Sequence, residues 1–307
     1  MPDQTVTQPP PDEAAARERR IGLLCALGVL VAWTGFLLSG RLATRQALTS
    51  WDMAALRFAG SFLGALPIVL LRGWPRLPVR RGLALAASAG LGYALPVYAA
   101  FHWAPTSHSG VMLIGMLPFV TAALAAVVLG ERWGARRLIS LAVVAAGIVL
   151  LAAATLGDHL GAWIGDGLFV LAAVFWSVYT LLVRHWRVPA LTAVLSVALW
   201  PAFFYLPIWW LLLPSRVAEA GSGAVALQFV YQGFVAALLA SFLFTRAVNA
   251  LGAGTATTVT ALVPALATLA AWPLLGEPPG LAGLAGVALV SAGILFGVLG
   301  SFGAARR

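Results

Sequence analysis

Residues 118–131 read PFVTAALAAVVLGE, and residues 264–277 repeat the pattern as PALATLAAWPLLGE, 146 positions further along the chain. In both stretches a glutamate follows a proline by thirteen residues. The same shift places Ala146-Gly147-Ile148 on Ala292-Gly293-Ile294. Agreement over two consecutive apolar segments predicts that the chain contains two copies of one structural unit.

The composition around these stretches is typical of a membrane protein. Of the 307 residues, 61% are hydrophobic and 9% are charged, and the mean hydropathy is +0.94. A soluble chain carries far more charge, and a helix needs about 20 apolar residues to cross the hydrocarbon core of a bilayer. We therefore expect an all-α polytopic membrane protein with ten transmembrane helices. The ten apolar runs are 21–39, 53–71, 83–104, 110–129, 136–155, 164–183, 191–213, 224–245, 254–275 and 281–300.

The two copies are expected to cross the membrane in opposite directions. The first five-helix repeat covers residues 21–155 and the second covers residues 164–300. Because five is an odd number, the second copy enters from the other side. Three arginines follow Glu131 within six residues, whereas two prolines and no nearby arginine follow Glu277. Inverted repeats of this kind are the architecture of many secondary transporters, since two related halves can exchange conformations.

The arginines also predict the orientation of the chain. All nineteen basic residues are arginine, and fifteen of them fall in segments that are cytoplasmic if the N-terminus is inside. Three fall in external loops, and Arg57 alone lies within a span. By the positive-inside rule, both termini are cytoplasmic in a bacterial-type inner membrane. We expect residues 1–20 to be a disordered cytoplasmic tail and residues 301–307 to be a cytoplasmic C-terminal tail.

The formal net charge of +9 does not indicate a nucleic-acid partner. The arginines flank apolar runs and do not form a patch on a soluble surface. The run 21–39 is also longer than the apolar core of a cleaved signal peptide. The expected partners are the lipid bilayer and a small-molecule metabolite, and the sequence leaves the oligomeric state open.

The repeated stretches resemble the drug/metabolite transporter superfamily, in the form with two EamA-type domains. The resemblance covers nearly everything after residue 20. It rests on Trp33, on the block 104–148 with Pro118 and residues 128–131, and on the block 251–294 with Pro264 and residues 274–277. It implies a ten-helix carrier of small metabolites, often an exporter of amino acids or related compounds. The chain departs from the family pattern in having Arg41 in place of a lysine and Pro278 where an arginine commonly follows the glutamate.

The sequence offers no set of residues for catalysis, and we predict that the chain is not an enzyme. Its four histidines are far apart and lack the HExxH spacing of a zinc site, and Cys25 is the only cysteine. The Gly-rich segment 280–286 lacks the lysine of a phosphate-binding loop. We therefore expect no metal site and no cofactor.

Candidate substrate-binding residues are the aromatic and polar side chains deep in the spans. Most of the twelve tryptophans lie near helix ends, where they anchor helices at the membrane interface. Polar residues within spans usually face the interior of a helix bundle, where they line a cavity or simply cross-link helices. The candidates are Trp33, Tyr93, Trp176, Thr180, Gln228, Tyr231, Gln232, Thr257 and Thr260.

Two prolines and three charged residues have two interpretations each. Pro118 and Pro264, near mid-span, are predicted hinges at a midplane site, the alternative being a kink packed against neighbouring helices. For Glu131 and Glu277, the shared motif residues, a structural role at helix ends is favoured over proton relay. Arg57 lies about 7.5 Å beyond Asp52 along a helix, so snorkelling to the interface is favoured over binding a substrate carboxylate.

These patterns predict a secondary transporter that binds its substrate between the two halves and works by alternating access. No carboxylate lies at mid-span, so neutral or zwitterionic substrates are favoured over permanent cations. The resemblance adds the direction, which is export of amino acids or related compounds. The alternative is a non-transporting membrane assembly or regulatory protein built on a carrier scaffold.

Overall fold

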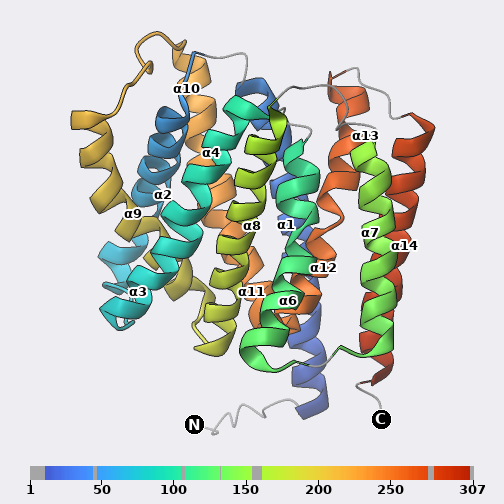
Figure 1. Cartoon of the computed structure of the whole chain (residues 1–307). Helices are drawn as coiled ribbons and strands as arrows, with labels where there is room; N and C mark the ends of the chain where they lie inside the picture. Colours follow the sequence, from blue (N-terminus) through green and yellow to red (C-terminus); the bar gives the residue numbers. More distant parts are fainter. Residues whose placement is uncertain are drawn as a thin grey trace, which may run out of the picture.

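The structure is a computed structural model that describes residues 11–43, 47–104, 108–131, 133–153, 161–275 and 280–304. All the regular secondary structure in these ranges is helical (Figure 1). Three segments, labelled η, are π-helical, a wider and rarer form of helix that is frequent at functional sites. In the first part of the chain the helices are α1 (Pro11–Ala43), α2 (Ser50–Arg72), α3 (Val79–Leu85), η1 (Ala86–Gly92), α4 (Tyr93–Trp103), η2 (Ser109–Gly115), α6 (Leu117–Leu129) and α7 (Ala135–Ala153).

The second part of the chain continues the bundle. Helices from the two parts pack in pairs, with α1 against α11, α2 against η3 and α4 against α8. The core therefore lies between the two parts. The helices after residue 160 are α8 (Ala162–His185), α9 (Ala190–Leu212), α10 (Ser222–Gln228), η3 (Phe229–Leu239), α11 (Ala240–Leu251), α12 (Ala253–Thr260), α13 (Val263–Leu275) and α14 (Leu281–Ala304).

Eight helical stretches among the described residues are long and apolar enough to cross a bilayer. They include Glu13–Ser39, Ser50–Arg72 and Val79–Trp103, which covers α3, η1 and α4. The runs expected at 136–155 and 281–300 correspond to α7 and α14, which are helical but are not among the eight. The structure thus confirms an all-helical polytopic membrane protein, and the count of ten spans stays a prediction.

Many large apolar side chains face outward, as a lipid-exposed surface requires. Leu71 is 86% exposed and Trp210 is 76% exposed, although both belong to helices long enough to cross a bilayer. In water such side chains would favour association or aggregation, whereas hydrocarbon accommodates them.

The N-terminal tail differs from the prediction. Helix α1 begins at Pro11, so residues 11–20 continue the first span as a helix and are not disordered. Three consecutive alanines with Glu and Arg around them favour a helix, and proline is tolerated in its first turn. Arg246 also pairs with Glu18 across a distance of 2.5 Å. Residues 1–10 and 305–307 lie outside the described part of the chain.

The two prolines lie at the starts of helical segments. Pro118 is the second residue of α6, after a break at Met116, and Pro264 is the second residue of α13, after a break at residues 261–262. Proline lacks the N–H group that a helix interior needs, but its fixed φ suits a first turn. Each proline therefore begins a new helical segment within a longer helical stretch.

The bounds of the helices in the two repeated stretches follow the 146-residue shift. Helices α6 and α13 begin and end 146 positions apart, and so do the first residues of α7 and α14. In Figure 1, α6 ends at the bottom of the molecule and α13 ends at the top. The matched segments therefore end at opposite ends of the molecule.

Helices α7 and α14 pack closely through two glycines. A Cβ at Gly147 would lie 2.7 Å from the Val290 backbone nitrogen, and a Cβ at Gly293 would lie 2.9 Å from the Val144 nitrogen. Ser140 Oγ donates a hydrogen bond of 2.8 Å to the Gly293 carbonyl. Small residues permit this approach in membrane helices, and the order of the contacts makes the pair antiparallel.

Candidate functional site

An aromatic cluster around Trp176 joins the two parts of the chain. Trp176 of α8 is 2% exposed. Its ring centroid lies 5.5 Å from Trp33 of α1, 4.8 Å from Tyr93 at the start of α4 and 5.5 Å from Phe244 of α11. Trp33 also stacks on Phe244, with 5.3 Å between centroids. Offset and edge-to-face pairs at these distances stabilise the cluster beyond the burial of their area.

A chain of hydrogen bonds runs beside this cluster. The Tyr98 hydroxyl donates to Gln232 Oε1 at 2.7 Å, Gln232 Nε2 donates to Gln228 Oε1 at 3.3 Å, and Gln228 Nε2 donates to the Ser39 carbonyl at 3.3 Å. Both glutamines are fully buried. Buried amides are costly unless they are paired, so this chain ties α4, η3, α10 and α1 together.

Arg57 is buried inside the molecule, and its predicted snorkelling to the interface is wrong. The side chain is 4% exposed, and the guanidinium carbon lies 5.4 Å from the centroid of the Tyr93 ring. None of the ion pairs found between described residues involves Arg57. The nearest acid along α2, Asp52, instead accepts hydrogen bonds from the Trp209 indole and from the Arg216 backbone, each at 3.0 Å.

A glycine crossing turns Arg57 inward. A Cβ at Gly60 would lie 2.6 Å from the Phe229 carbonyl, and a Cβ at Gly233 would lie 2.5 Å from the Gly60 Cα. These two glycines therefore let α2 and η3 touch backbone to backbone. Arg57 lies one turn before Gly60 and Gln232 adjoins Gly233, so the crossing brings both side chains into the interior.

The structure brings five of the nine candidate residues together, namely Trp33, Tyr93, Trp176, Gln228 and Gln232. Tyr231 lies at the edge, where its hydroxyl donates to the Ala32 carbonyl at 3.1 Å. The three threonines use their hydroxyls locally, on backbone carbonyls three or four residues earlier in the chain. These bonds are Thr180 to Trp176, Thr257 to Ala253 and Thr260 to Thr257.

Sequence reasoning missed three members of this region. Tyr179 lies 5.4 Å from Trp176 between ring centroids, and its hydroxyl is 2.6 Å from that of Thr245. Tyr179 follows Trp176 by three residues on one helix, and this spacing indicates that the two side chains are neighbours on one face. Tyr98 and Phe244 come from other helices, and only the packing of those helices brings them here.

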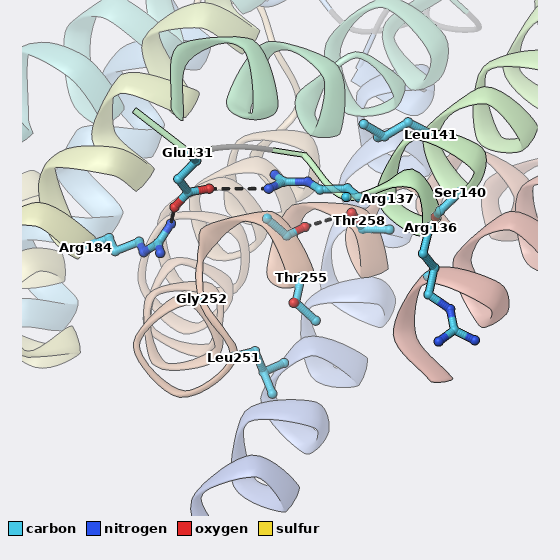
Figure 2. Close-up of a pocket in the computed structure, with 13 residues that line it drawn as sticks. Glu131, Arg136, Arg137, Ser140, Leu141, Arg184, Leu251, Gly252, Thr255 and Thr258 are labelled. Carbon is cyan, nitrogen blue, oxygen red and sulfur yellow. Dashed lines mark hydrogen bonds and ion pairs between the residues drawn. The ribbon is translucent and has the colours of Figure 1, made fainter. Parts of the chain in front are cut away.

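A pocket of about 380 Å³ opens at the end of the molecule where α6 ends and α7 begins (Figure 2). Glu131 lies in its wall and accepts hydrogen bonds from Arg184 of α8 and, at 3.3 Å, from Arg137 of α7. Gly130 has a φ of 64°, a left-handed value that ends α6 and favours glycine. The pocket is lined by Glu131, Gly134, Arg136, Arg137, Ser140, Leu141, Arg184, Leu251, Gly252, Gly254, Thr255, Thr258 and Gly297. Glu277, the matching glutamate, lies outside the described residues.

The described residues contain no group of three His, Cys, Asp or Glu side chains that could hold a metal ion. The closest pair is His108, which is 3% exposed, and Asp166 of α8, with Nδ1 and Oδ1 2.7 Å apart. This pair links the start of η2 to α8. His159 lies outside the described part of the chain.

The long apolar helices define a polytopic membrane protein with an aromatic and polar cluster in its interior. The chain belongs to the EamA-like transporter family, whose sequence model matches residues 20–153 and 163–299. The predicted resemblance is thereby confirmed, and the family is one of transporters rather than enzymes.

Two similar proteins extend this comparison. The chain is 26% identical over 263 residues to a Salmonella typhimurium (strain LT2) protein named "Probable amino-acid metabolite efflux pump". The matched region covers 81% of this chain and 85% of that protein. A solved structure titled "Crystal structure of protein" matches with a TM-score of 0.71 and 22% identity, over 91% of this chain and 96% of the other. The second match supports the fold alone.

Proposed function

We propose that this chain is a secondary transporter of the bacterial-type inner membrane that exports small neutral or zwitterionic metabolites, amino acids or related compounds, by alternating access. Membership of the EamA-like transporter family supports transport. The name of the Salmonella relative supports efflux and the class of substrate. The aromatic and amide side chains of the interior cluster suit an apolar body that carries a few hydrogen-bonding groups.

We further propose that ten spans form two inverted five-helix repeats. The contacts of Gly147 with Val290 and of Gly293 with Val144 support this arrangement, because each contact is the image of the other under the 146-residue shift. A reciprocal, antiparallel pair of this kind is expected at a pseudo-two-fold axis between inverted halves. The opposite directions of α6 and α13 in Figure 1 agree.

The observation that carries the proposal is the contact between Trp33 and Trp176. Trp33 and Arg41 recur 143 positions further along the chain as Trp176 and Arg184, which makes the two tryptophans equivalent positions of the two copies. Their rings lie 5.5 Å apart. Equivalent residues of two repeats can touch only close to the axis that relates them. The substrate site of an inverted-repeat transporter lies at that repeat interface, so we place the site around Trp33 and Trp176.

The orientation follows from the arginines. Arg184, Arg136 and Arg137 gather around the pocket in Figure 2, and Arg81 lies over the Trp186 ring at 5.2 Å. We assign this arginine-rich end to the cytoplasm, which places both chain termini inside. The paired Glu131 then links the first half to α8 of the second half at the cytoplasmic side.

Counterflow in liposomes tests the proposed function. Purified protein is reconstituted into vesicles loaded with one amino acid, and entry of the same labelled compound is followed for a panel of amino acids, with ethidium as a permanent cation. We expect exchange of at least one amino acid and none of ethidium. Trp176→Ala should slow that exchange, whereas Trp210→Ala, which alters a lipid-facing residue, should not.

Two results would contradict the proposal. If folded, monodisperse protein exchanges no compound above the level of protein-free vesicles, the chain is not a carrier and the assembly or regulatory alternative is favoured. If ethidium exchanges as fast as any amino acid and Trp176→Ala leaves its rate unchanged, both the proposed substrate class and the proposed site are wrong.

A further inference from the structure

We infer that Arg57 is the substrate-specificity residue of the carrier and that it binds a carboxylate group of the transported molecule. The inference rests on the proposed transport function and refines its substrate class, because it makes the carboxylate, and not the amino group, the feature that the protein recognises. Monoanionic N-acylated amino acids are then accepted beside zwitterionic amino acids. Its evidence is the placement of Arg57, Tyr93 and Trp176 in the interior cluster.

Arg57 is a buried cation to which the described part of the chain brings no anion. It is 4% exposed, and no ion pair between described residues includes it. The face of the Tyr93 ring offsets only part of the cost of removing a guanidinium from water. Asp52 is not available to it, because the Trp209 indole and the Arg216 backbone already hold that carboxylate.

A second donor lies on the same aromatic ring. The indole N–H of Trp176 is buried and has no hydrogen-bond acceptor among the described residues. Trp176 packs on Tyr93 at 4.8 Å, and Arg57 lies over that ring at 5.4 Å. Arg57 hydrogen-bonds the neutral Tyr98 hydroxyl but has no anion among the described residues, and the Trp176 indole has no acceptor. An incoming group with negative charge and two acceptor oxygens matches this cation and this N–H, which flank Tyr93.

The charge of the cluster selects a carboxylate over the other anions that arginine binds. Arg57 is the one charged side chain among the described residues of the cluster, so the cluster supplies one positive charge. One guanidinium balances a monoanionic carboxylate but leaves a dianionic phosphate with excess charge in a low-dielectric interior. The rings of Trp33, Trp176 and Phe244 then offer an apolar wall for the body of the molecule.

The same cluster contains no carboxylate to receive an ammonium group. Its polar members are Arg57, Tyr93, Tyr98, Gln228 and Gln232, and the two glutamine side chains are occupied by each other, by Tyr98 and by the Ser39 carbonyl. A free amino group is therefore not required for recognition. The protein should accept an N-acylated amino acid, which keeps the carboxylate but lacks a free amino group. It should discriminate against an amino acid amide, which keeps the amino group but lacks the carboxylate.

Binding measurements on the purified full-length protein test this inference. The probes are N-acetylphenylalanine, phenylalanine, phenylalaninamide and inorganic phosphate, titrated by calorimetry. The variants are R57Q and R57K, with R81Q as the matched control, because Arg81 also lies over an aromatic ring, that of Trp186, but at the arginine-rich end of the molecule. Size-exclusion profiles and circular dichroism establish that each variant is folded.

For the wild type and R81Q we expect both carboxylates to bind at least about tenfold more tightly than the amide and phosphate. R57Q should lose that preference by weakening the carboxylates while leaving the amide unchanged, and R57K should retain part of it. The inference is overturned if wild type binds acid and amide equally, if phosphate binds as well as the carboxylates, or if folded R57Q keeps the preference. Should R57Q fail to fold, the test is the ratio of acid to amide affinity in the wild type and in R57K. A preference for the acid that is smaller in R57K supports the inference, and an equal preference in both proteins overturns it.

These outcomes are distinct from those of the transport assay. Acid-selective binding that R57Q abolishes, in a protein that exchanges nothing in vesicles, supports the role of Arg57 in ligand recognition and refutes transport. Equal exchange of phenylalanine and phenylalaninamide supports transport and refutes the role of Arg57.

Discussion

The close contact between α7 and α14 requires a residue without a Cβ atom at position 147, which is Gly147. A Cβ there would lie 2.7 Å from both the backbone nitrogen and a methyl carbon of Val290, and 2.9 Å from the Gly286 carbonyl. Two of these three atoms belong to backbone, so a side chain cannot be accommodated by a rotamer change. Overpacking of this kind typically costs about 1–3 kcal/mol.

We predict that Gly147→Ala lowers the thermal unfolding temperature of the protein in detergent. The matched control is Gly167→Ala in α8, where no atom lies within 4 Å of the added Cβ and alanine favours the helix. The control should unfold at or above the wild-type temperature. An unfolding temperature for Gly147→Ala equal to that of the control would show that α7 and α14 do not pack as described.

Single residues also show where sequence reasoning reaches its limit. Gln228 and Gln232 were candidates because they are polar residues deep in a span, and both side chains are fully buried. Arg57 was misjudged because its depth was counted along α2 alone. The direction in which it points depends on the crossing of Gly60 with Gly233, two residues 173 positions apart, and nothing in the local sequence reports that contact.

At the scale of elements, each proline begins a helical segment immediately after a break. Pro118→Ala and Pro264→Ala would supply an N–H group and allow the preceding helix to continue through the break. If the breaks serve as hinges, both variants should insert and fold normally but slow counterflow. Normal counterflow by both variants would mean that the breaks only satisfy packing.

The ion pairs of Glu131 join two elements from different halves. We predict that Glu131→Gln lowers the unfolding temperature more than Glu18→Gln does, because it removes the charge that both Arg137 and Arg184 face. Glu18 is 54% exposed and pairs only with Arg246 among the described residues, and exposed single pairs contribute about 0–1 kcal/mol. The difference should shrink in high salt. Equal effects of the two substitutions would contradict a bridging role for Glu131.

Helix ends were easier to predict from sequence than helix type. The Gly-Glu motif marked the end of α6, because Gly130 can adopt the left-handed conformation that stops a helix. The three π-helical segments had no local signal, and two of them, η1 and η3, adjoin or contain the residues that meet in the interior cluster. Wide turns of this kind depend on tertiary packing, which periodicity does not contain.

At the scale of the whole molecule, the central claim is that two related halves face opposite sides of one membrane. Gly134 and Gly280 offer a direct comparison, because they are 146 positions apart, immediately before α7 and α14. Both are exposed, and no atom lies within 4 Å of an added Cβ at either position. Cys25 is the only cysteine and is buried, so replacing it by serine leaves a background without thiols.

The decisive measurement is labelling of Gly134→Cys and Gly280→Cys, each in the Cys25→Ser background, with a membrane-impermeant maleimide applied to intact cells and to inverted membrane vesicles. Inverted halves predict that Gly280→Cys reacts in intact cells and that Gly134→Cys reacts only in inverted vesicles. Labelling of both positions from the same side would contradict the inverted repeat and, with it, the proposed alternating access.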